Sequence, residues 1–395
     1  MRKPDLCFFQ HVLDEINPRP SEVVMVDDKA ENICAARSVG IHGVLVNGAP
    51  AGVGQTLRNL FLDPISRAET YLKNNAGNLD SVVEGRDIVI KDNFCQLMIW
   101  ELTGDADIIY LRWPSGKVQG KVHGAQTSAG GGDNDRSMTA PVRGKLENGL
   151  WNYFYGETVL TTREFPPDAD TTSTAYLSVP ESYLSEMADV KLVLEAMASN
   201  TSPDGIMQTY FCDDRPRTSP EVCCNILRVF YRFDRQHAQS HSPPDPRIRR
   251  TEEWVIRCLK NRAYLYGSRV YSVPEAFLYF AAQLYVELGC GHDHDPHHDA
   301  YPLKAGLEPI KEALLERINA KTNPLALALR VSACQLVGLE RSRYRQDLDA
   351  LKSLQEEDGG WPAGHFCCTG RTGDRIGNRG LTTALAAKVI RHERV

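Results

Sequence analysis

From Asp92 onward, apolar residues recur about every three to four positions, which is the spacing of amphipathic helices. The pattern predicts helices at 183–198, 274–288, 309–320, 324–337, 345–354 and 381–391. Several of these segments begin near a proline or a capping residue, as helices often do. Because no strand-like segments separate them, the pattern predicts a helical bundle, a solenoid or an α/α barrel. Polar and glycine-rich stretches predict loops at 120–137, 240–246 and 291–299.

The amino-terminal segment follows a different pattern. Between Ser21 and Asn47, an apolar strand, two aspartates, a helical stretch and a second apolar strand follow one another, which predicts a Rossmann-type β-α-β unit. Parallel sheets bind ligands at the carboxyl ends of their strands, where Asp27 and Asp28 are placed. The expected division of the chain is an α/β segment at 1–50, a linker and first helix at 51–91, and a helical domain at 92–395.

Composition and charge restrict the partners of the chain. Its 395 residues, of which 42% are hydrophobic, are enough for two domains with a large core. A formal net charge of −6 argues against a molecule-wide attraction to nucleic acid, so any anion site must be local. No apolar run reaches the roughly 18 residues of a transmembrane segment, and the amino terminus lacks a signal-peptide pattern. A cytoplasmic protein is therefore expected.

The segment Glu164-Phe-Pro-Pro-Asp168-Ala-Asp170-Thr is the strongest candidate for chemistry. Two carboxyl groups two residues apart outside a helix can lie so close that one of them keeps its proton. A protonated aspartate in an apolar cavity is a strong acid toward an alkene. The alternative is a solvated turn in which Asp168 or Asp170 caps the next helix, and the spacing alone leaves both open.

The run Asp168-Ala-Asp170-Thr-Thr-Ser resembles the D-x-D-T-T-S signature of drimane-type sesquiterpene cyclases, a variant of the D-x-D-D motif of class II terpene cyclases. The resemblance implies that Asp170 protonates the terminal double bond of farnesyl diphosphate, and that Asp168 and Thr171 orient Asp170. The implied product is a bicyclic drimane-type diphosphate. Thr171 stands where the wider class has a third aspartate.

A second segment, from Gln355 to Trp361, resembles the Q-x-x-x-G-x-W repeat of the α/α-barrel cyclases. Its expected role is structural, with the Gln355 amide bonded to a helix end and the Trp361 indole packed between helices. The two motifs together predict a mainly α protein, in which a class II terpene cyclase α/α barrel follows a partial α/β segment.

Three arginines lie four residues apart between Thr369 and Thr383, among glycines and before a helix. Guanidinium groups fit phosphate oxygens, although a solvated basic face is the alternative. This segment and the one from Asn261 to Tyr271 also resemble parts of the same cyclases, in which arginines bind diphosphate and aromatic rings stabilise a cation. The predicted substrate-binding residues are Arg371, Arg375, Asn378, Arg379, Tyr266 and Arg269.

The first 50 residues resemble part of the haloacid-dehalogenase superfamily, through Lys3 and the run from Val24 to Asn32. In that superfamily a lysine steadies a phosphoryl group and strand-end acids hold Mg²⁺. The resemblance implies that Asp27, Asp28 and Glu31 bind Mg²⁺ against a diphosphate. The alternative is a helix cap without a metal.

The matching nucleophile strand of a phosphatase is not found before Lys3. Asp168 and Asp170 have the spacing of that nucleophile motif, but Pro166 and Pro167 precede them, and proline does not fit an interior strand. The phosphatase part is therefore expected to be incomplete, with a separate phosphatase acting downstream. The rival interpretations are a bifunctional cyclase and phosphatase that releases the drimane alcohol, a prenyl-diphosphate phosphatase, and a helical-repeat binding module.

Overall fold

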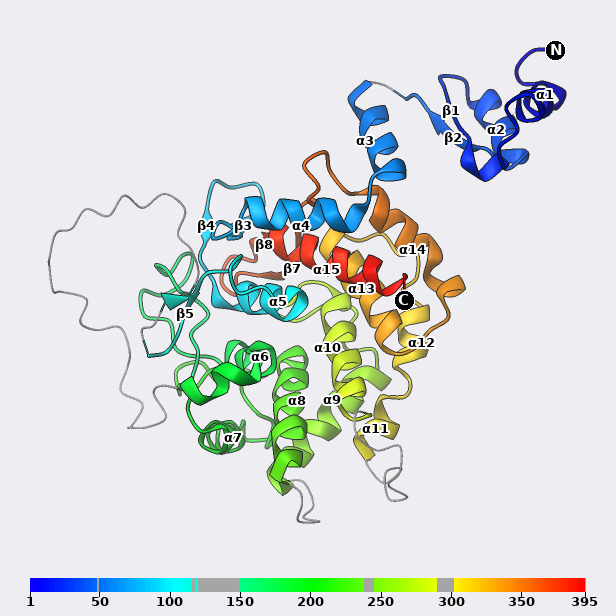
Figure 1. Cartoon of the computed structure of the whole chain (residues 1–395). Helices are drawn as coiled ribbons and strands as arrows, with labels where there is room; N and C mark the ends of the chain where they lie inside the picture. Colours follow the sequence, from blue (N-terminus) through cyan, green and yellow to red (C-terminus); the bar gives the residue numbers. More distant parts are fainter. Residues whose placement is uncertain (48–49, 116–117, 120–148, 238–244, 290–301, 395) are drawn as a thin grey trace, which may run out of the picture.

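The computed structural model describes residues 1–47, 50–115, 118–119, 149–237, 245–289 and 302–394. A small α/β segment projects from a large helical domain, and α3 (Pro50–Phe61) joins the two (Figure 1). The predicted loops at 120–137 and 291–299, and most of the one at 240–246, lie outside the described ranges. Within these ranges, no helix has the length and apolarity that crossing a membrane requires.

The helical domain is built on a ring of inner helices. These are α5 (Asn93–Thr103), α6 (Ala169–Ser178), α8 (Pro220–His237), α10 (Pro274–Glu287), α13 (Pro324–Leu336) and α15 (Arg379–His392). Each helix packs against the next, and α15 packs against α5, which closes the ring. All of α6 and most of α10, α13 and α15 are buried, as expected for helices that lie inside a domain.

Further helices cover the outside of the ring. They are α4 (Pro64–Asn74), α7 (Val190–Ser199), α9 (Arg249–Lys260), α11 (Pro302–Leu307), α12 (Ile310–Leu315) and α14 (Arg341–Ser353), with 3-10 turns at Glu181–Glu186 and Pro246–Ile248. α4 and α14 pack on α15, α7 and α9 pack on α8, and α12 packs on α10 and α13. An inner ring covered by outer helices is an α/α barrel, which confirms the predicted fold class.

The pattern of apolar residues did not reveal the strands of this domain. β4 (Val89–Ile90), β3 (Ser81–Val83), β8 (Arg375–Asn378) and β7 (Gly364–Cys368) form one antiparallel sheet in that order, and β5 (Leu111–Arg112) pairs with β6 (Val118–Gln119). The strands are only two to five residues long, too short for a clear alternation of apolar and polar residues. The glycine-rich segment before α15 is therefore a β7–β8 hairpin.

The α/β segment has a small core of its own. It contains α1 (Leu6–Ile16), a 3-10 turn at Pro20–Glu22, β1 (Val24–Asp27), α2 (Ala30–Ser38) and β2 (His42–Leu45). β1 and β2 pair in parallel, as the β-α-β pattern predicts. Its core residues form a cluster separate from the main core, which begins at Ile65. Residues 64–90, expected as part of a linker, thus contribute α4, β3 and β4 to the helical domain.

Several helix boundaries differ from the predicted ones. α10 and α13 agree with their predicted segments to within a residue. The segment 183–198 is instead divided into a 3-10 turn and α7, because the Asp189 side chain accepts a hydrogen bond from the Lys191 N–H and so begins a new helix. α14 begins at Arg341, four residues before its predicted start.

The segment from Gln355 to Trp361 has the structural role predicted for it. The buried Gln355 amide donates to the carbonyl oxygens of Pro64, at 2.9 Å, and Gly359, at 2.8 Å, and so joins the end of α14 to the start of α4. The Trp361 indole is fully buried and donates to the Leu351 carbonyl at 2.7 Å. Gly359 has a φ of +92°, which an L side chain rarely adopts.

Candidate functional site

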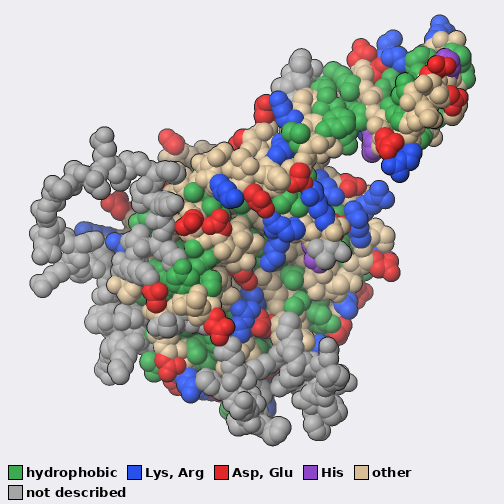
Figure 2. All heavy atoms as spheres, viewed as in Figure 1, with side chains coloured by type: hydrophobic (Ala, Val, Ile, Leu, Met, Phe, Trp, Pro, Cys, Tyr) green, Lys and Arg blue, Asp and Glu red, His purple; other side chains and the backbone are tan. Residues whose placement is uncertain are grey.

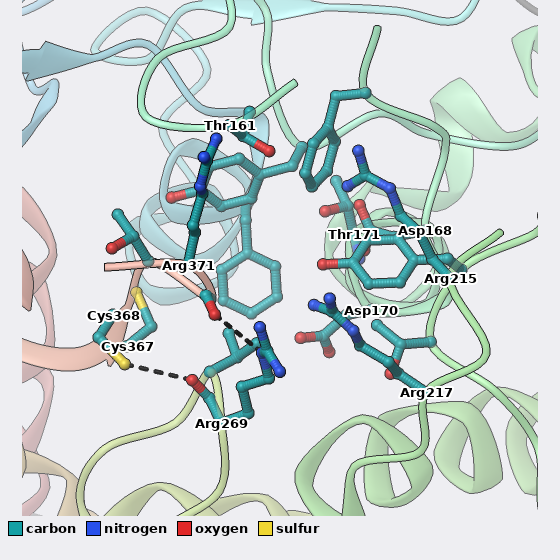
Figure 3. Close-up of a pocket in the computed structure, with 18 of the residues that line it drawn as sticks. Thr161, Asp168, Asp170, Thr171, Arg215, Arg217, Arg269, Cys367, Cys368 and Arg371 are labelled. Atoms are coloured by element: carbon teal, nitrogen blue, oxygen red, sulfur yellow. Dashed lines mark hydrogen bonds between the residues drawn. The ribbon is translucent and has the colours of Figure 1, made fainter. Parts of the chain in front are cut away.

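A cavity of about 410 Å³ lies at one end of the helix ring. Its volume falls within the range of roughly 300–1,000 Å³ that is typical of ligand pockets. Three inner helices direct their amino-terminal ends at it, through Phe94 of α5, Asp170 of α6 and Val222 of α8. The β7–β8 hairpin and the loops before α6, α8 and α10 supply the other walls (Figure 3).

Asp168 caps α6, as one alternative predicted, but it is buried at this cavity and does not lie in a solvated turn. One carboxylate oxygen, Oδ1, accepts a hydrogen bond from the Thr171 N–H at 2.7 Å. The other oxygen, Oδ2, is buried and has no partner among the described residues. Burial, together with the nearby charge of Asp170, raises the pKa of Asp168 to about 8. Asp168 is therefore protonated at neutral pH.

Asp170 lies in the first turn of α6 and is 8% exposed. Its Oδ1 accepts a hydrogen bond from Asn225 Nδ2 at 2.9 Å, and its Oδ2 accepts one from the Tyr271 hydroxyl. Burial raises the pKa of Asp170 to about 6, while these two hydrogen bonds, which favour the carboxylate, act in the opposite direction. A carboxyl group that titrates near neutral pH is suited to proton transfer.

The residues that orient Asp170 differ from those implied by the motif. Thr171 is buried at the cavity and donates its backbone N–H to Asp168, not its hydroxyl to Asp170. Asn225 of α8 and Tyr271 hold Asp170 instead. The sequence offered one signal for Asn225, a single amide within an apolar run. Tyr271 belongs to a segment that the sequence linked to cation stabilisation, not to the orientation of Asp170.

Aromatic rings form much of the cavity wall. They are Phe94, Tyr153, Phe154, Phe165, Tyr210 and Tyr271. Phe165 packs edge-to-face on both Phe154 and Tyr210, with centroid distances of 5.1 and 5.6 Å. Aromatic faces attract positive charge, so this wall is suited to a cationic species that forms next to Asp170.

The arginines at this cavity are only partly those predicted. Arg269 and Arg371 line it, as do Arg215 and Arg217, which were not among the predicted substrate-binding residues (Figure 3). Arg375 lies on β8, and because side chains alternate across a strand, its neighbour Ile376 faces the cavity instead.

Three further predicted substrate-binding residues lie outside the cavity. Tyr266 is 96% exposed to solvent. Asn378 caps α15 by accepting from the Leu381 N–H and donates to the Leu79 carbonyl. Arg379 pairs with acidic residues next to Trp361 and stacks on Tyr71, 4.6 Å from the ring centroid. Both Asn378 and Arg379 therefore have structural contacts that occupy their polar groups.

Arg379→Ala is expected to lower stability without weakening substrate binding. The substitution removes its ion pairs with Glu356 and Asp358, which are partly exposed, and its stacking on Tyr71. Together these contacts are expected to contribute about 1–2 kcal/mol to the free energy of unfolding. Denaturant unfolding measures the first effect. The KM for farnesyl diphosphate, the substrate that the resemblance implies, measures the second. A large rise in KM with unchanged stability would show that Arg379 binds the substrate.

The acids predicted to bind Mg²⁺ are not arranged for it. Asp27 is fully engaged, because its Oδ2 accepts from Lys3 Nζ at 2.5 Å and its Oδ1 accepts from the Lys29 N–H and Asn32 Nδ2, both at 2.9 Å. The Lys3 hydrogen bond is the main reason that the pKa of Asp27 is lowered. Asp28 and Glu31 are exposed.

In the described part of the chain, no three His, Cys, Asp or Glu side chains are grouped so that they could hold a metal ion. Asp27, Asp28 and Glu31 also do not line the cavity of Asp170. The residues present therefore do not fit a Mg²⁺ site that faces a diphosphate in that cavity.

Asp168→Asn is expected to make stability less dependent on pH. In the unfolded chain an aspartate titrates near pH 4, whereas in the folded protein the pKa of Asp168 is about 8. Between these pH values the unfolded chain loses the proton of this residue while the folded protein keeps it. The free energy of unfolding is therefore highest below the lower value and falls until pH has risen through the higher one. Asparagine keeps the helix cap without ionising. Thermal melting at pH 6 and pH 9 should show a smaller loss of Tm in the variant, and an equal loss would contradict burial as the cause.

Comparisons with known proteins relate the chain to sesquiterpene cyclases. Residues 65–233 match the family described as the sesquiterpene cyclase astC-like C-terminal domain. The chain is 36% identical over 391 residues to drimenol cyclase drtB of Aspergillus calidoustus, a match that covers 99% of this chain and 62% of that protein. A shorter match, 52% identical over 44 residues, is to sesquiterpene phosphatase astK of Aspergillus oryzae and covers 11% of this chain and 22% of that protein.

The fold agrees with a solved structure of the type II terpene cyclase MstE from Scytonema. The TM-score is 0.52 at 11% identity, over 88% of this chain and 100% of that one. At this identity the likeness shows the fold alone, which is that of a type II terpene cyclase. The present chain spans about 62% of the length of the drimenol cyclase that it matches.

Proposed function

We propose that this chain, a relative of the drimane-type sesquiterpene cyclases, is a class II terpene cyclase that converts farnesyl diphosphate into a bicyclic drimane-type diphosphate. One observation carries the proposal: Asp170 is buried at an aromatic cavity, and its pKa is raised to about 6. An acid that keeps its proton up to about pH 6, well above the usual range of an aspartate, next to rings that stabilise a cation, is suited to protonation of an alkene.

The reaction begins when the Asp170 carboxyl gives its proton to the distal double bond of the folded prenyl chain. The π electrons of that bond form the new C–H bond and leave a tertiary cation, which the next double bonds attack in turn to close two rings. Asn225 and Tyr271 hold the resulting carboxylate by hydrogen bonds. Loss of a proton from the bicyclic cation to a base or bound water ends the sequence.

The walls of the cavity fold the prenyl chain of the substrate and protect the carbocation from water. An extended prenyl chain cannot cyclise, so the cavity must hold the double bonds close together. The binding energy then compensates for the conformational entropy that the chain loses before it reacts. Phe165 and its neighbours offer ring faces and edges instead of water, which would otherwise capture the cation. The carbon–oxygen bond to the diphosphate takes no part in these steps.

A second candidate is a bifunctional enzyme that cyclises and then releases the drimane alcohol. The relative drtB is named for an alcohol, drimenol, and a short segment of this chain matches a sesquiterpene phosphatase. A separate phosphatase acting on the released diphosphate is the alternative that we favour. Asp27, the strand-end acid of the α/β segment, is tied by hydrogen bonds to Lys3, Lys29 and Asn32.

A requirement for Mg²⁺ and a cytoplasmic location remain predictions. Since Asp27, Asp28 and Glu31 do not form a metal site facing the cavity, no step above depends on a metal. Product formation with and without EDTA tests whether Mg²⁺ is needed.

Incubation of the purified chain with farnesyl diphosphate tests the function. The products are treated with an added phosphatase and analysed by gas chromatography and mass spectrometry. A bicyclic drimane alcohol that depends on active protein is expected. If farnesol alone is recovered over a range of pH that includes 6, the cyclase assignment fails.

A further inference from the structure

Four arginines surround the mouth of the cavity, and they come from separate parts of the chain. Arg215 and Arg217 precede α8, Arg269 precedes α10, and Arg371 lies in the turn between β7 and β8. Figure 3 shows their side chains around the cavity that Asp168 and Asp170 line. The four therefore place positive charge on one opening.

These arginines differ from most other described arginines in forming no ion pair, although Asp214 lines the same cavity and its charge interacts with that of Arg215. Among the described residues, none of the four forms an ion pair with a carboxylate within 4.0 Å. By contrast, Arg375 pairs with Glu84, and Arg379 pairs with Glu356 and Asp358. Charges of both signs are otherwise mixed over the visible surface (Figure 2). Like charges near one another repel, and a negatively charged ligand would relieve this repulsion among the four guanidinium groups.

The backbone at Gly370 shows how closely two of the guanidinium groups approach. A Cβ atom at Gly370 would lie 3.3 Å from Arg217 Nη1 and 3.6 Å from Arg269 Nε. Arg269 Nε also donates a hydrogen bond to the Gly370 carbonyl at 2.8 Å. Glycine thus lets two cations from distant loops converge on the hairpin turn that carries Arg371.

Two of the four arginines, Arg215 and Arg217, also lie next to rings of the aromatic wall. The Arg215 guanidinium lies 4.9 Å from the centroid of Phe165 and 5.5 Å from that of Tyr210. Arg217 lies 6.0 Å from the centroid of Tyr210. An anionic head bound by these arginines would therefore hold an attached hydrocarbon chain against the rings next to Asp170.

We propose that Arg215, Arg217, Arg269 and Arg371 bind the diphosphate of the substrate by direct contact, without a metal bridge. The proposal rests on the function proposed above and names the residues that hold the head of its substrate. Guanidinium groups offer paired N–H donors that match phosphate oxygens. Arg215 and Arg217 are half-buried, and Arg269 and Arg371 are exposed. The acids of the α/β segment take no part, since Asp27 is already paired with Lys3 and lies outside this cavity.

Titration calorimetry with inorganic pyrophosphate in EDTA tests the proposal. The intact chain should bind pyrophosphate saturably, and Arg217→Ala and Arg269→Ala should each weaken binding about tenfold or more, since each removes a charge-assisted contact. Arg217→Lys should recover only part of the affinity, because lysine keeps the charge and loses the paired donors. Gly370→Ala should also weaken binding by crowding the two guanidinium groups.

Arg86→Ala is the matched control. It removes one positive charge from an arginine that pairs with Asp374 at 3.0 Å and is outside the cavity lining, so pyrophosphate affinity should not change. An equal loss in the control would show a general charge effect and overturn the proposal. Failure of the intact chain to bind pyrophosphate at millimolar concentrations in EDTA would overturn it as well.

The test separates this proposal from the cyclase assignment. Asp170→Asn should keep pyrophosphate affinity and lose cyclisation, because the acid and the arginines act on opposite ends of the substrate. If the arginine variants bind pyrophosphate like the intact chain, the diphosphate site is wrong while cyclisation can still be observed. If no cyclisation is found, the pyrophosphate titration still shows whether the four arginines form an anion site.

Discussion

Asp170→Asn is expected to reduce bicyclic product to the limit of detection while leaving the fold intact. The amide has the size of the carboxyl group, can still accept from Asn225 and can donate to the Tyr271 hydroxyl, so both contacts of Asp170 remain possible. It has no proton acidic enough for an alkene. Loss of a general acid alone lowers rates by about 10²–10⁴-fold. The measurement is bicyclic product per enzyme, with circular dichroism and thermal melting as checks of folding.

Asp92→Asn serves as the control for burial and charge. Asp92 is also a fully buried helix cap, at the start of α5, and burial raises its pKa to about 6, as for Asp170. It does not line the cavity, so its replacement should leave cyclisation near the level of the intact chain. Substantial bicyclic product from Asp170→Asn would show that another group supplies the proton, and Asp168, with its unpaired Oδ2, would be the next candidate.

The pH profile gives an independent view of the same acid. The reaction needs the protonated form of Asp170, so activity should fall as pH rises above about 6. The Tyr271 hydroxyl donates to the carboxylate and thereby lowers the pKa of Asp170. Tyr271→Phe removes that bond, and the falling limb should move to higher pH. If activity falls at the same pH in this variant as in the intact chain, the titrating group is not Asp170.

The acid pair could be found from the sequence because its geometry is local. Asp168 and Asp170 are two residues apart, and a cap followed by a first helical turn keeps both at the same end of α6. The segment from Gln355 to Trp361 is partly local, since Gln355 donates to Gly359 and Trp361 donates to Leu351, whereas the bond from Gln355 to Pro64 depends on the packing of α4. The structure of such short motifs depends mainly on contacts between residues that are close in sequence.

The partners of Asp170 and of the diphosphate could not be found in this way. Asn225 and Tyr271 are 55 and 101 residues away in sequence, and they meet Asp170 only because the helix ring closes. The arginines between Thr369 and Thr383 looked equivalent at intervals of four, but the segment is a hairpin followed by a helix. Strand alternation and a helix start therefore turn Arg375 and Arg379 away from the cavity that Arg371 lines.

Residues 1–395 alone are expected to release a cyclic diphosphate and little free alcohol. Protonation at the distal double bond leaves the bond between carbon and the diphosphate intact, and the arginines at the cavity mouth can bind the anion but cannot attack it. Hydrolysis of the haloacid-dehalogenase type needs a free aspartate nucleophile that forms a covalent phospho-intermediate.

In the α/β segment, the acid at the end of β1 is Asp27, which resembles a metal-holding acid of that superfamily and not its nucleophile. Both of its oxygens accept hydrogen bonds, from Lys3 Nζ, the Lys29 N–H and Asn32 Nδ2. Direct detection of the intact cyclic diphosphate by liquid chromatography and mass spectrometry, with phosphatase inhibitors present, measures the ratio of the two products. Asp27→Asn is the matched variant, and it should leave the small amount of alcohol unchanged. Prompt and stoichiometric release of alcohol and phosphate by the purified chain, lost in Asp27→Asn, would show that this carboxylate does act on the diphosphate and that the chain carries both activities.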